Sequence, residues 1–144
     1  MIIRPLEEKD IPYVEEIEKE AFGDRAWSAS LFSDELKDAS KHYLAAEKDG
    51  VLCGYGGFAH ILDEAHIMNI AVDRACRGQR IGRQLLKALL QKAESLGIRA
   101  VTLEVSDNNT AAISLYESEG FALAGVRKDY YGKNEHARIY WRII

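Results

Sequence analysis

The feature that most constrains the fold is a long amphipathic stretch in the middle of the chain. Between Gly82 and Leu96, apolar residues recur at helical spacing on one face: Leu85, Leu86, Leu89, Leu90 and Ala93. Gly97 follows, at the position where a left-handed residue commonly ends a helix. The alternating segment Arg99 to Val105 comes directly after it and is typical of a strand. The centre of the chain therefore predicts a helix that packs along a sheet.

The rest of the chain alternates between extended and helical patterns. Further strands are expected over residues 2–4, 42–47, 51–59, 65–72, 121–127 and 138–143. Further helices are expected over residues 10–22, from Ser28 or Ser30 to about Leu36, and over 110–118. Asp49-Gly50 joins two of the strands and suits a tight hairpin turn. A hairpin followed by strands alternating with helices predicts an α/β domain with a mixed sheet.

Composition narrows the classes of function. The 144 residues fit one domain over 1–144, and the formal net charge of −4 argues against a generic nucleic-acid-binding surface. No apolar run approaches the roughly 20 residues that span a bilayer, and no signal-peptide pattern opens the chain. Cys53 and Cys76 have neither metal-site spacing nor a disulfide framework, and four scattered histidines suggest no metal. We expect a cytoplasmic protein without a metal; oligomeric state leaves no mark on the sequence.

A glycine- and arginine-rich run precedes the central helix. This run, called the anion loop below, consists of Arg77, Gly78, Gln79, Arg80, Ile81, Gly82 and Arg83. Unpaired backbone N–H groups and the positive end of the helix dipole make a helix N-terminus a site for phosphates. Taken alone, the run fits a solvated basic turn equally well. It matches neither a Walker A loop nor a dinucleotide-binding loop.

The anion loop resembles the coenzyme A pyrophosphate motif of the GNAT acetyltransferases: Arg or Gln, two residues, Gly, one residue, then Gly or Ala. Arg77 and Gly82 match its outer positions, whereas Arg80 replaces its first glycine. The resemblance covers nearly the whole chain and narrows to the RimI-type branch. It is most specific over residues 109–121, and other matching segments are 21–22, 27–28, 62–65, 69–73, 103–105 and 127–131.

This resemblance implies a fold, a cosubstrate and a set of contacts. The fold is the GNAT fold, in which two central strands splay apart and the pantetheine of acetyl-CoA lies between them. The implied acetyl-CoA contacts are the backbone of Ile70, Ala71 and Val72, the anion loop (Arg77, Gly78, Gln79, Arg80, Ile81, Gly82, Arg83) and Asn109. Without the resemblance, residues 70–72 read simply as a buried strand.

Two residues are candidates for the chemistry. Alternation along residues 101–105 places Thr102 and Glu104 on one face of the strand, where a glutamate is usually just solvent-exposed. Tyr116 lies seven residues after Asn109, about two helical turns along one face, where an aromatic residue usually belongs to the core. The resemblance assigns Glu104 as the proton acceptor and Tyr116 as the donor to the departing sulfur.

The expected activity is direct transfer of acetyl from acetyl-CoA to a protein N-terminal amine. For the RimI-type branch, the acceptor is the N-terminal alanine of the eighteenth small-subunit ribosomal protein. Phe22, Trp27, Tyr130 and Tyr131 either line a peptide groove or pack in the core. Two alternatives stay open: a GNAT enzyme for another amine, such as other N-termini, lysine, an antibiotic or a polyamine, and a non-catalytic acetyl-CoA-binding module.

Overall fold

The computed structural model describes all 144 residues, with seven strands in one mixed sheet. The elements in chain order are β1 (Ile2–Pro5), η1 (Glu8–Asp10), α1 (Ile11–Phe22), η2 (Gly23–Arg25), α2 (Ala29–Leu36), β2 (Lys41–Lys48), β3 (Val51–Ile61), β4 (Glu64–Val72), η3 (Arg74–Cys76), α3 (Ile81–Ser95), β5 (Ala100–Ser106), α4 (Thr110–Ser118), β6 (Ala122–Gly132) and β7 (Glu135–Ile143). The η elements are single 3-10 turns. The predicted α/β class is confirmed.

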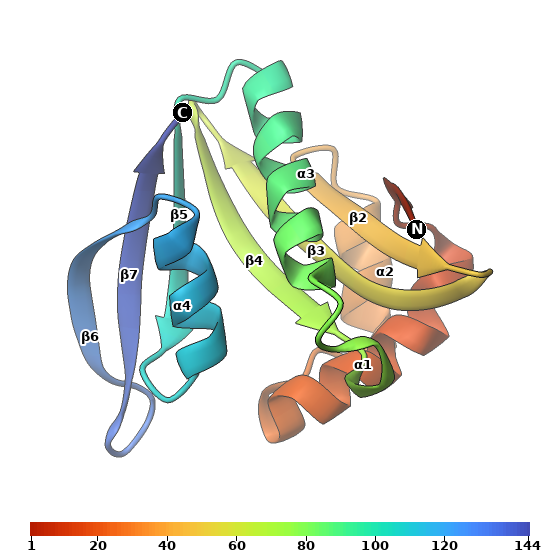
Figure 1. The fold of residues 1–144 in the computed structure, drawn as a ribbon, viewed down its shortest axis with the longest axis horizontal. Coiled ribbons are helices and arrows are strands. Elements are labelled where there is room, and N and C mark those ends of the chain that lie inside the picture. The colour runs from red at the N-terminus through yellow and green to blue at the C-terminus, as the bar shows by residue number, and fades with distance from the viewer.

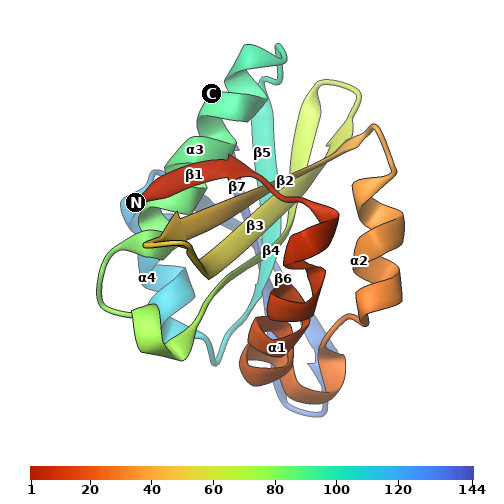
Figure 2. The same ribbon diagram turned by 90° about the vertical axis from the view of Figure 1, so that its right-hand side faces the viewer.

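The strands lie in the order β1-β2-β3-β4-β5-β7-β6, and only β4 and β5 are parallel neighbours. Helices α1 and α2 cover one face of the first four strands, while α3 and α4 lie on the opposite face (Figures 1 and 2). One buried cluster joins α3 and α4 to the sheet, and another joins α1 and α2 to it. No helix is both long and apolar enough to cross a lipid bilayer.

The two parallel strands separate along their length. β4 pairs with β5 only over residues 64–66 and 100–102, and beyond this point the strands diverge (Figure 1). A bulge in β4 accompanies the divergence: Gly57 pairs with Asn69 and Phe58 with Ile67, which leaves Met68 as the extra residue. A bulge bends its strand and increases the local twist. The splay implied by the family resemblance is therefore present.

Most of the expected elements occur within a residue or two of their predicted bounds. Asp49 and Gly50 have φ angles of 53° and 79°, so both take the left-handed conformation that a tight hairpin turn requires. The C-terminal hairpin is longer than predicted: β6 continues to Gly132 and β7 begins at Glu135. Most of β6 is exposed, so hydrophobic alternation could not reveal its second half, where the register is irregular, Gly132 pairs with Glu135 and the Asp129 N–H donates to the His136 ring.

One strand glycine permits a close approach. A Cβ atom on Gly57 would lie 2.2 Å from Cδ1 of Tyr43, so the ring of Tyr43 occupies the space that any side chain at position 57 would need. Tyr43 lies against β3 at this position and belongs to the core that α1 and α2 cover. The interpretation of the strand glycines as sites of close backbone approach is confirmed at this position.

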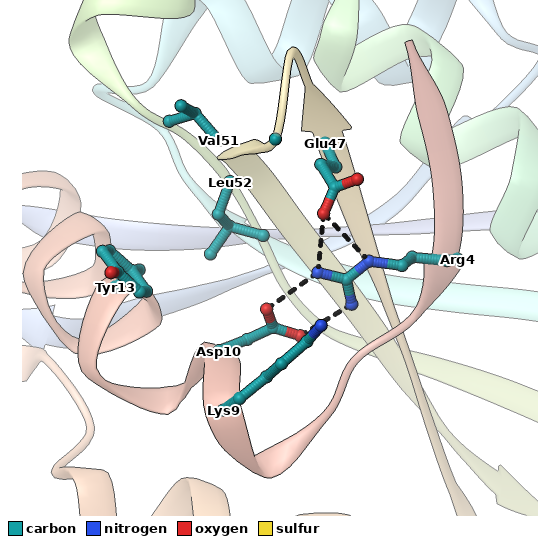
Figure 3. A pocket seen from close by; sticks show the side chains of 8 residues that line it. Arg4, Lys9, Asp10, Tyr13, Glu47, Val51 and Leu52 are labelled. Carbon is teal, nitrogen blue, oxygen red and sulfur yellow. Dashed lines mark hydrogen bonds and ion pairs between the residues drawn. The ribbon is translucent and has the colours of Figure 1, made fainter.

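A depression at the β1 edge of the sheet is filled by an ion-pair network (Figure 3). Arg4 donates two hydrogen bonds of 2.8 Å to Asp10 and also contacts Glu47 at 3.2 Å. The bonds from Arg4 hold the pKa of Asp10 below its ordinary value. Strands β2 and β3 separate this edge from the splay. The depression therefore belongs to the packing of the N-terminal segment rather than to the candidate site.

Candidate active site

The open end of the splay exposes one edge of β4. Residues 70–72 pair with Gly56, Tyr55 and Gly54 of β3, but their other edge has no strand partner. A strand edge without a partner presents backbone N–H and C=O groups to whatever lies in the gap. The three β4 residues named from the sequence thus line the opening between the two halves of the sheet.

The anion loop lies at the end of this edge and leads into α3. Gly78 has a φ of 81°, and Arg80, the N-cap residue of α3, has φ 61° and ψ 24°. Arg80 therefore keeps the left-handed conformation suited to glycine although the residue itself is arginine. That conformation costs a non-glycine residue about 1–2 kcal/mol. The departure from the family pattern changes the side chain but preserves a backbone shape that glycine adopts freely.

The three arginines of the loop have different surroundings. Arg77 lies 3.6 Å from Glu20, and Arg83 donates a 2.7 Å hydrogen bond to Glu119. Arg80 forms no ion pair or side-chain hydrogen bond, so its guanidinium is the one of the three that is free for an external anion. Gln79 accepts a 2.8 Å bond from Lys48. Ile81 is buried in the core and offers an anion only its backbone.

Glu104 lies on β5 beyond the point where β4 departs. Val101, Leu103 and Val105 point into the core beneath α3 and α4, so alternation turns Glu104 toward the other face, as predicted. Its side chain is 29% exposed, and its Oε1 lies 3.5 Å from the guanidinium of Arg127 on β6. The carboxylate of Glu104 therefore lies at the splay, next to the guanidinium of Arg127 and partly open to solvent.

Tyr116 lies on α4 in the core cluster and is 7% exposed. Its ring packs edge-on against Phe121 with 5.7 Å between centroids. No hydrogen bond within the chain occupies its hydroxyl, and burial raises its pKa, which keeps the phenol protonated. Asn109 caps α4, and its side-chain oxygen accepts a 3.2 Å bond from the N–H of Ala112. The core-packing interpretation of Tyr116 holds, with a free hydroxyl in addition.

The aromatic residues proposed for a peptide groove divide into two groups. Trp27 packs on Phe32 with 5.3 Å between ring centroids, and Phe22 borders the same core cluster. Tyr130 and Tyr131 lie in the C-terminal hairpin, with 5.0 Å between their ring centroids. Burial and then the charge of Glu104 raise the pKa of Tyr131 to about 12, so this phenol is protonated. Arg127, which lies 3.5 Å from Glu104, also lies over the ring of Tyr130 at 5.6 Å from its centroid, so the hairpin tyrosines are the pair linked to Glu104.

Sequence patterns did not predict a contact between the α1–α2 connection and the C-terminal hairpin. Arg25, in the α1–α2 connection, donates a 3.2 Å hydrogen bond to Glu135 and lies 4.8 Å above the ring of Tyr131. Glu135 also accepts a 2.8 Å bond from Ser106. Because Arg25 and Glu135 are 110 positions apart, no local spacing links them.

A second missed residue is Glu18, which is 1% exposed on the sheet-facing side of α1. Its carboxyl accepts bonds from the Asn69 side chain at 3.0 and 3.2 Å and from the Trp27 N–H at 3.3 Å. Burial raises the pKa of Glu18 from 4.5 to about 7. A signal for it does exist in the sequence: Glu18 lies four residues after Val14 and seven after Ile11, on the apolar stripe of the helix.

The sequence is similar to a known protein family and to several of its members. The family model described as "Acetyltransferase (GNAT) family" matches residues 6–121. The "[Ribosomal protein bS18]-alanine N-acetyltransferase" of Escherichia coli is 36% identical over 129 residues, covering 90% of this chain and 86% of that protein. The "N-alpha-acetyltransferase RimI" of Mycobacterium tuberculosis is 40% identical over 121 residues, covering 81% and 75% respectively.

A solved structure agrees with these relatives. The crystal structure of the bS18-alanine N-acetyltransferase from Escherichia coli superposes with a TM-score of 0.89 at 33% identity, covering 99% of this chain and 93% of that one. The match spans the sheet, the splay and all the helices that flank them. The chain therefore belongs to the acetyltransferase (GNAT) family, in its RimI-type branch, and is an enzyme that transfers acetyl groups.

Proposed function

We propose that this enzyme transfers acetyl from acetyl-CoA to the α-amino group of the N-terminal alanine of ribosomal protein bS18. The observation that carries the proposal is the near-full-length similarity to bS18-alanine N-acetyltransferases, together with a carboxylate and a free phenol at the splay. A ribosomal-protein acceptor also supports the cytoplasmic location expected from the sequence. No group of three or more metal-ligating side chains lies together in the structure.

The residues present fit the cosubstrate. Acetyl-CoA, when bound, supplies a thioester and a pyrophosphate. The N-terminal turn of α3 and the free guanidinium of Arg80 offer backbone and charge-assisted bonds to a pyrophosphate. The unpaired edge of β4 at residues 70–72 offers backbone groups to an extended amide chain and to the thioester carbonyl. Because the Asn109 oxygen caps α4, its NH2 group is the part left to contact the cosubstrate.

The proton balance defines what the side chains must do. An α-ammonium has a pKa near 8, loses one proton before attack and a second as the amide forms. The departing sulfur gains one proton, and the other is released to solvent. Glu104, which has a route to solvent, accepts the proton of the ammonium directly or through a water molecule. This carboxylate lies on the face of β5 opposite the core residues Val101, Leu103 and Val105, beside Arg127.

Tyr116 acts first as a hydrogen-bond donor rather than as a full proton donor. Because burial raises its pKa, the phenol is protonated and serves first as a hydrogen-bond donor to the developing thiolate. A thiol has an ordinary pKa near 8.5, so complete transfer of the phenolic proton is uphill until the loaded site lowers the pKa of Tyr116. Its hydroxyl, free of partners in the chain, is available for that bond.

The test is a coenzyme A release assay with acetyl-CoA and a panel of acceptors. The panel contains a bS18 N-terminal peptide, the same peptide with a blocked N-terminus, other N-terminal peptides and polyamines. The proposal predicts rapid turnover of the free bS18 peptide and none of the blocked form. Turnover with polyamines alone would keep the enzyme class and reject the acceptor, whereas acetyl-CoA binding without turnover of any acceptor would contradict the proposed transfer.

A further inference from the structure

Two cysteines that are distant in sequence meet at the base of the anion loop. Cys53 lies on β3, and Cys76 is the last residue of η3, immediately before the loop. The Cys76 thiol donates to the Cys53 sulfur at 2.8 Å. That separation is shorter than the ~3.5–4.0 Å at which non-bonded carbon atoms pack. The fold therefore places the two sulfur atoms within a small movement of bonding distance.

The backbone holds the pair in this position independently of the thiols. The N–H of Asp73 donates a 2.8 Å bond to the carbonyl of Cys53, and the N–H of Cys76 donates a 2.9 Å bond to the carbonyl of Asp73. Cys53 is buried with Ile81 and Leu85, while Cys76 is only partly buried at the edge of this cluster. The Cys76 thiol is thus accessible to a small reagent, whereas the Cys53 thiol is buried next to it.

We infer that Cys53 and Cys76 form a thiol–disulfide pair that closes under oxidising conditions and ties the start of the anion loop to β3. Closure joins a buried strand to the residue directly before Arg77. The pair itself does not depend on the proposed acceptor or on acetyl transfer. Its position beside the loop predicts an effect on loop mobility, which is measured below without an activity assay.

The oxidant we assign is a low-molecular-weight disulfide. The thiolate of Cys76, the accessible residue, attacks one sulfur of the reagent, so a mixed disulfide forms and one small thiolate leaves. The thiolate of Cys53 then attacks the Cys76 sulfur and releases the second small thiolate. Two protein thiols are oxidised, one reagent disulfide is reduced to two thiols, and the two protein protons pass to the leaving thiolates.

The first step is slow at neutral pH. The bond to Cys53 and burial raise the pKa of Cys76 to about 11, with Asp73 raising it further and Lys48 of β2 lowering it. Only a small fraction of Cys76 is then thiolate, and that fraction rises about tenfold for each pH unit below the pKa. The pair therefore rests as two thiols in a reducing interior and closes under sustained oxidation, faster as the pH rises.

The experiment uses the full chain incubated with oxidised glutathione, followed by alkylation of free thiols and intact-mass analysis. Wild type is expected to lose two hydrogens and to accept no alkylating groups, whereas Cys53→Ala is expected to stop at a glutathione adduct on Cys76. The internal bond should raise the melting temperature by about 5–10 °C, and dithiothreitol should reverse the rise. Trypsin cleavage after Arg74, Arg77 and Arg80 should slow several-fold in the oxidised protein.

Two results would overturn the inference. If wild type accumulates the same mixed disulfide as Cys53→Ala, or keeps both thiols free, the pair does not close. If the internal bond forms but the melting temperature and the tryptic rate stay unchanged, the bond does not restrain the loop. Cys76→Ser, which cannot react at the accessible position, should show no adduct and serves as the baseline for both measurements.

Discussion

Glu18 and Glu104 are the same amino acid on opposite sides of the splay. They differ in solvent exposure, in neighbouring cations and in hydrogen-bond partners. Glu18 on α1 is 1% exposed, has no cation beside it and is bonded by Asn69 and the Trp27 N–H. Glu104 on β5 is 29% exposed and lies 3.5 Å from Arg127. Burial raises the pKa of Glu18 to about 7, because desolvation disfavours the charged carboxylate and favours the protonated form.

Enclosure, rather than distance from the splay, distinguishes the two glutamates: Glu18 is shut off from solvent, whereas Glu104, the proposed base, is partly open to it. Glu18 joins the bulged strand β4 to the segment that precedes α2 and is closed off from solvent. Glu104 is partly exposed and has a neighbouring cation. The predictions below change one glutamate, or a residue beside the acetyl-CoA path, at a time.

The largest expected effect separates the two glutamates by activity. Glu104→Gln should lower turnover at least about a hundredfold, because an amide cannot accept the ammonium proton. Acetyl-CoA binding, measured by calorimetry, should remain as in wild type. The matched control is Glu18→Gln, which should keep turnover within about threefold of wild type, since its carboxyl is buried and its hydrogen bonds are made within the chain. A variant pair with the reverse pattern would overturn the assignment of the base.

The second prediction concerns stability and pH. The folded protein holds a proton on Glu18 up to about pH 7, whereas an ordinary glutamate loses it near 4.5, so between these values the folded state binds more protons. Stability should therefore fall as the pH rises through this window, by roughly 3 kcal/mol from this group.

Urea unfolding of wild type and Glu18→Gln at about pH 5 and pH 8 isolates the contribution of Glu18. Wild type should lose more stability between the two pH values than the variant does, because glutamine does not titrate. Equal losses in the two proteins would mean that the Glu18 pKa is not raised.

The third prediction tests Tyr116. Tyr116→Phe should lower turnover about tenfold to a hundredfold through loss of the donor to the sulfur. Stability should change by less than about 1 kcal/mol, since the phenylalanine ring keeps the packing and no hydrogen bond within the chain is lost. Differential scanning calorimetry checks the second point. Full turnover by this variant would leave Tyr116 with a packing role only.

The smallest expected effect concerns the left-handed arginine. Arg80→Gly should raise the unfolding free energy by about 0.5–1 kcal/mol, because glycine adopts a φ of 61° without strain. It should also raise the Michaelis constant for acetyl-CoA about threefold to tenfold by removing a charge-assisted bond. Arg80→Asn, which tolerates the same backbone without a cation, separates charge from conformation. An unchanged constant in both variants would remove Arg80 from the binding site.

Local patterns predicted the elements but not the contacts between them. The stripe of leucines around Leu86 fixed α3 to within one residue, and Asp49-Gly50 located the first hairpin, because both signals depend on neighbours in sequence. The splay and the positions of residues 70–72 followed from family resemblance, since periodicity alone cannot distinguish a diverging strand from a paired one.

The missed features depend on contacts between distant segments. The spacing of Cys53 and Cys76 in the sequence did not predict a disulfide, yet β3 and η3 bring their sulfur atoms together. Arg25 and Glu135 meet because the fold places the α1–α2 connection next to the C-terminal hairpin. The left-handed φ of Arg80 runs against the preference of arginine, so the residue type gave no sign of it.

The most direct test of the central claim uses one peptide that carries the bS18 N-terminal sequence with a free alanine and also an internal lysine. After a single round of acetyl transfer, tandem mass spectrometry locates the acetyl group on the peptide. We expect acetyl on the α-amine of the alanine and an unmodified lysine side chain. Acetyl on the lysine with a free N-terminus would contradict it.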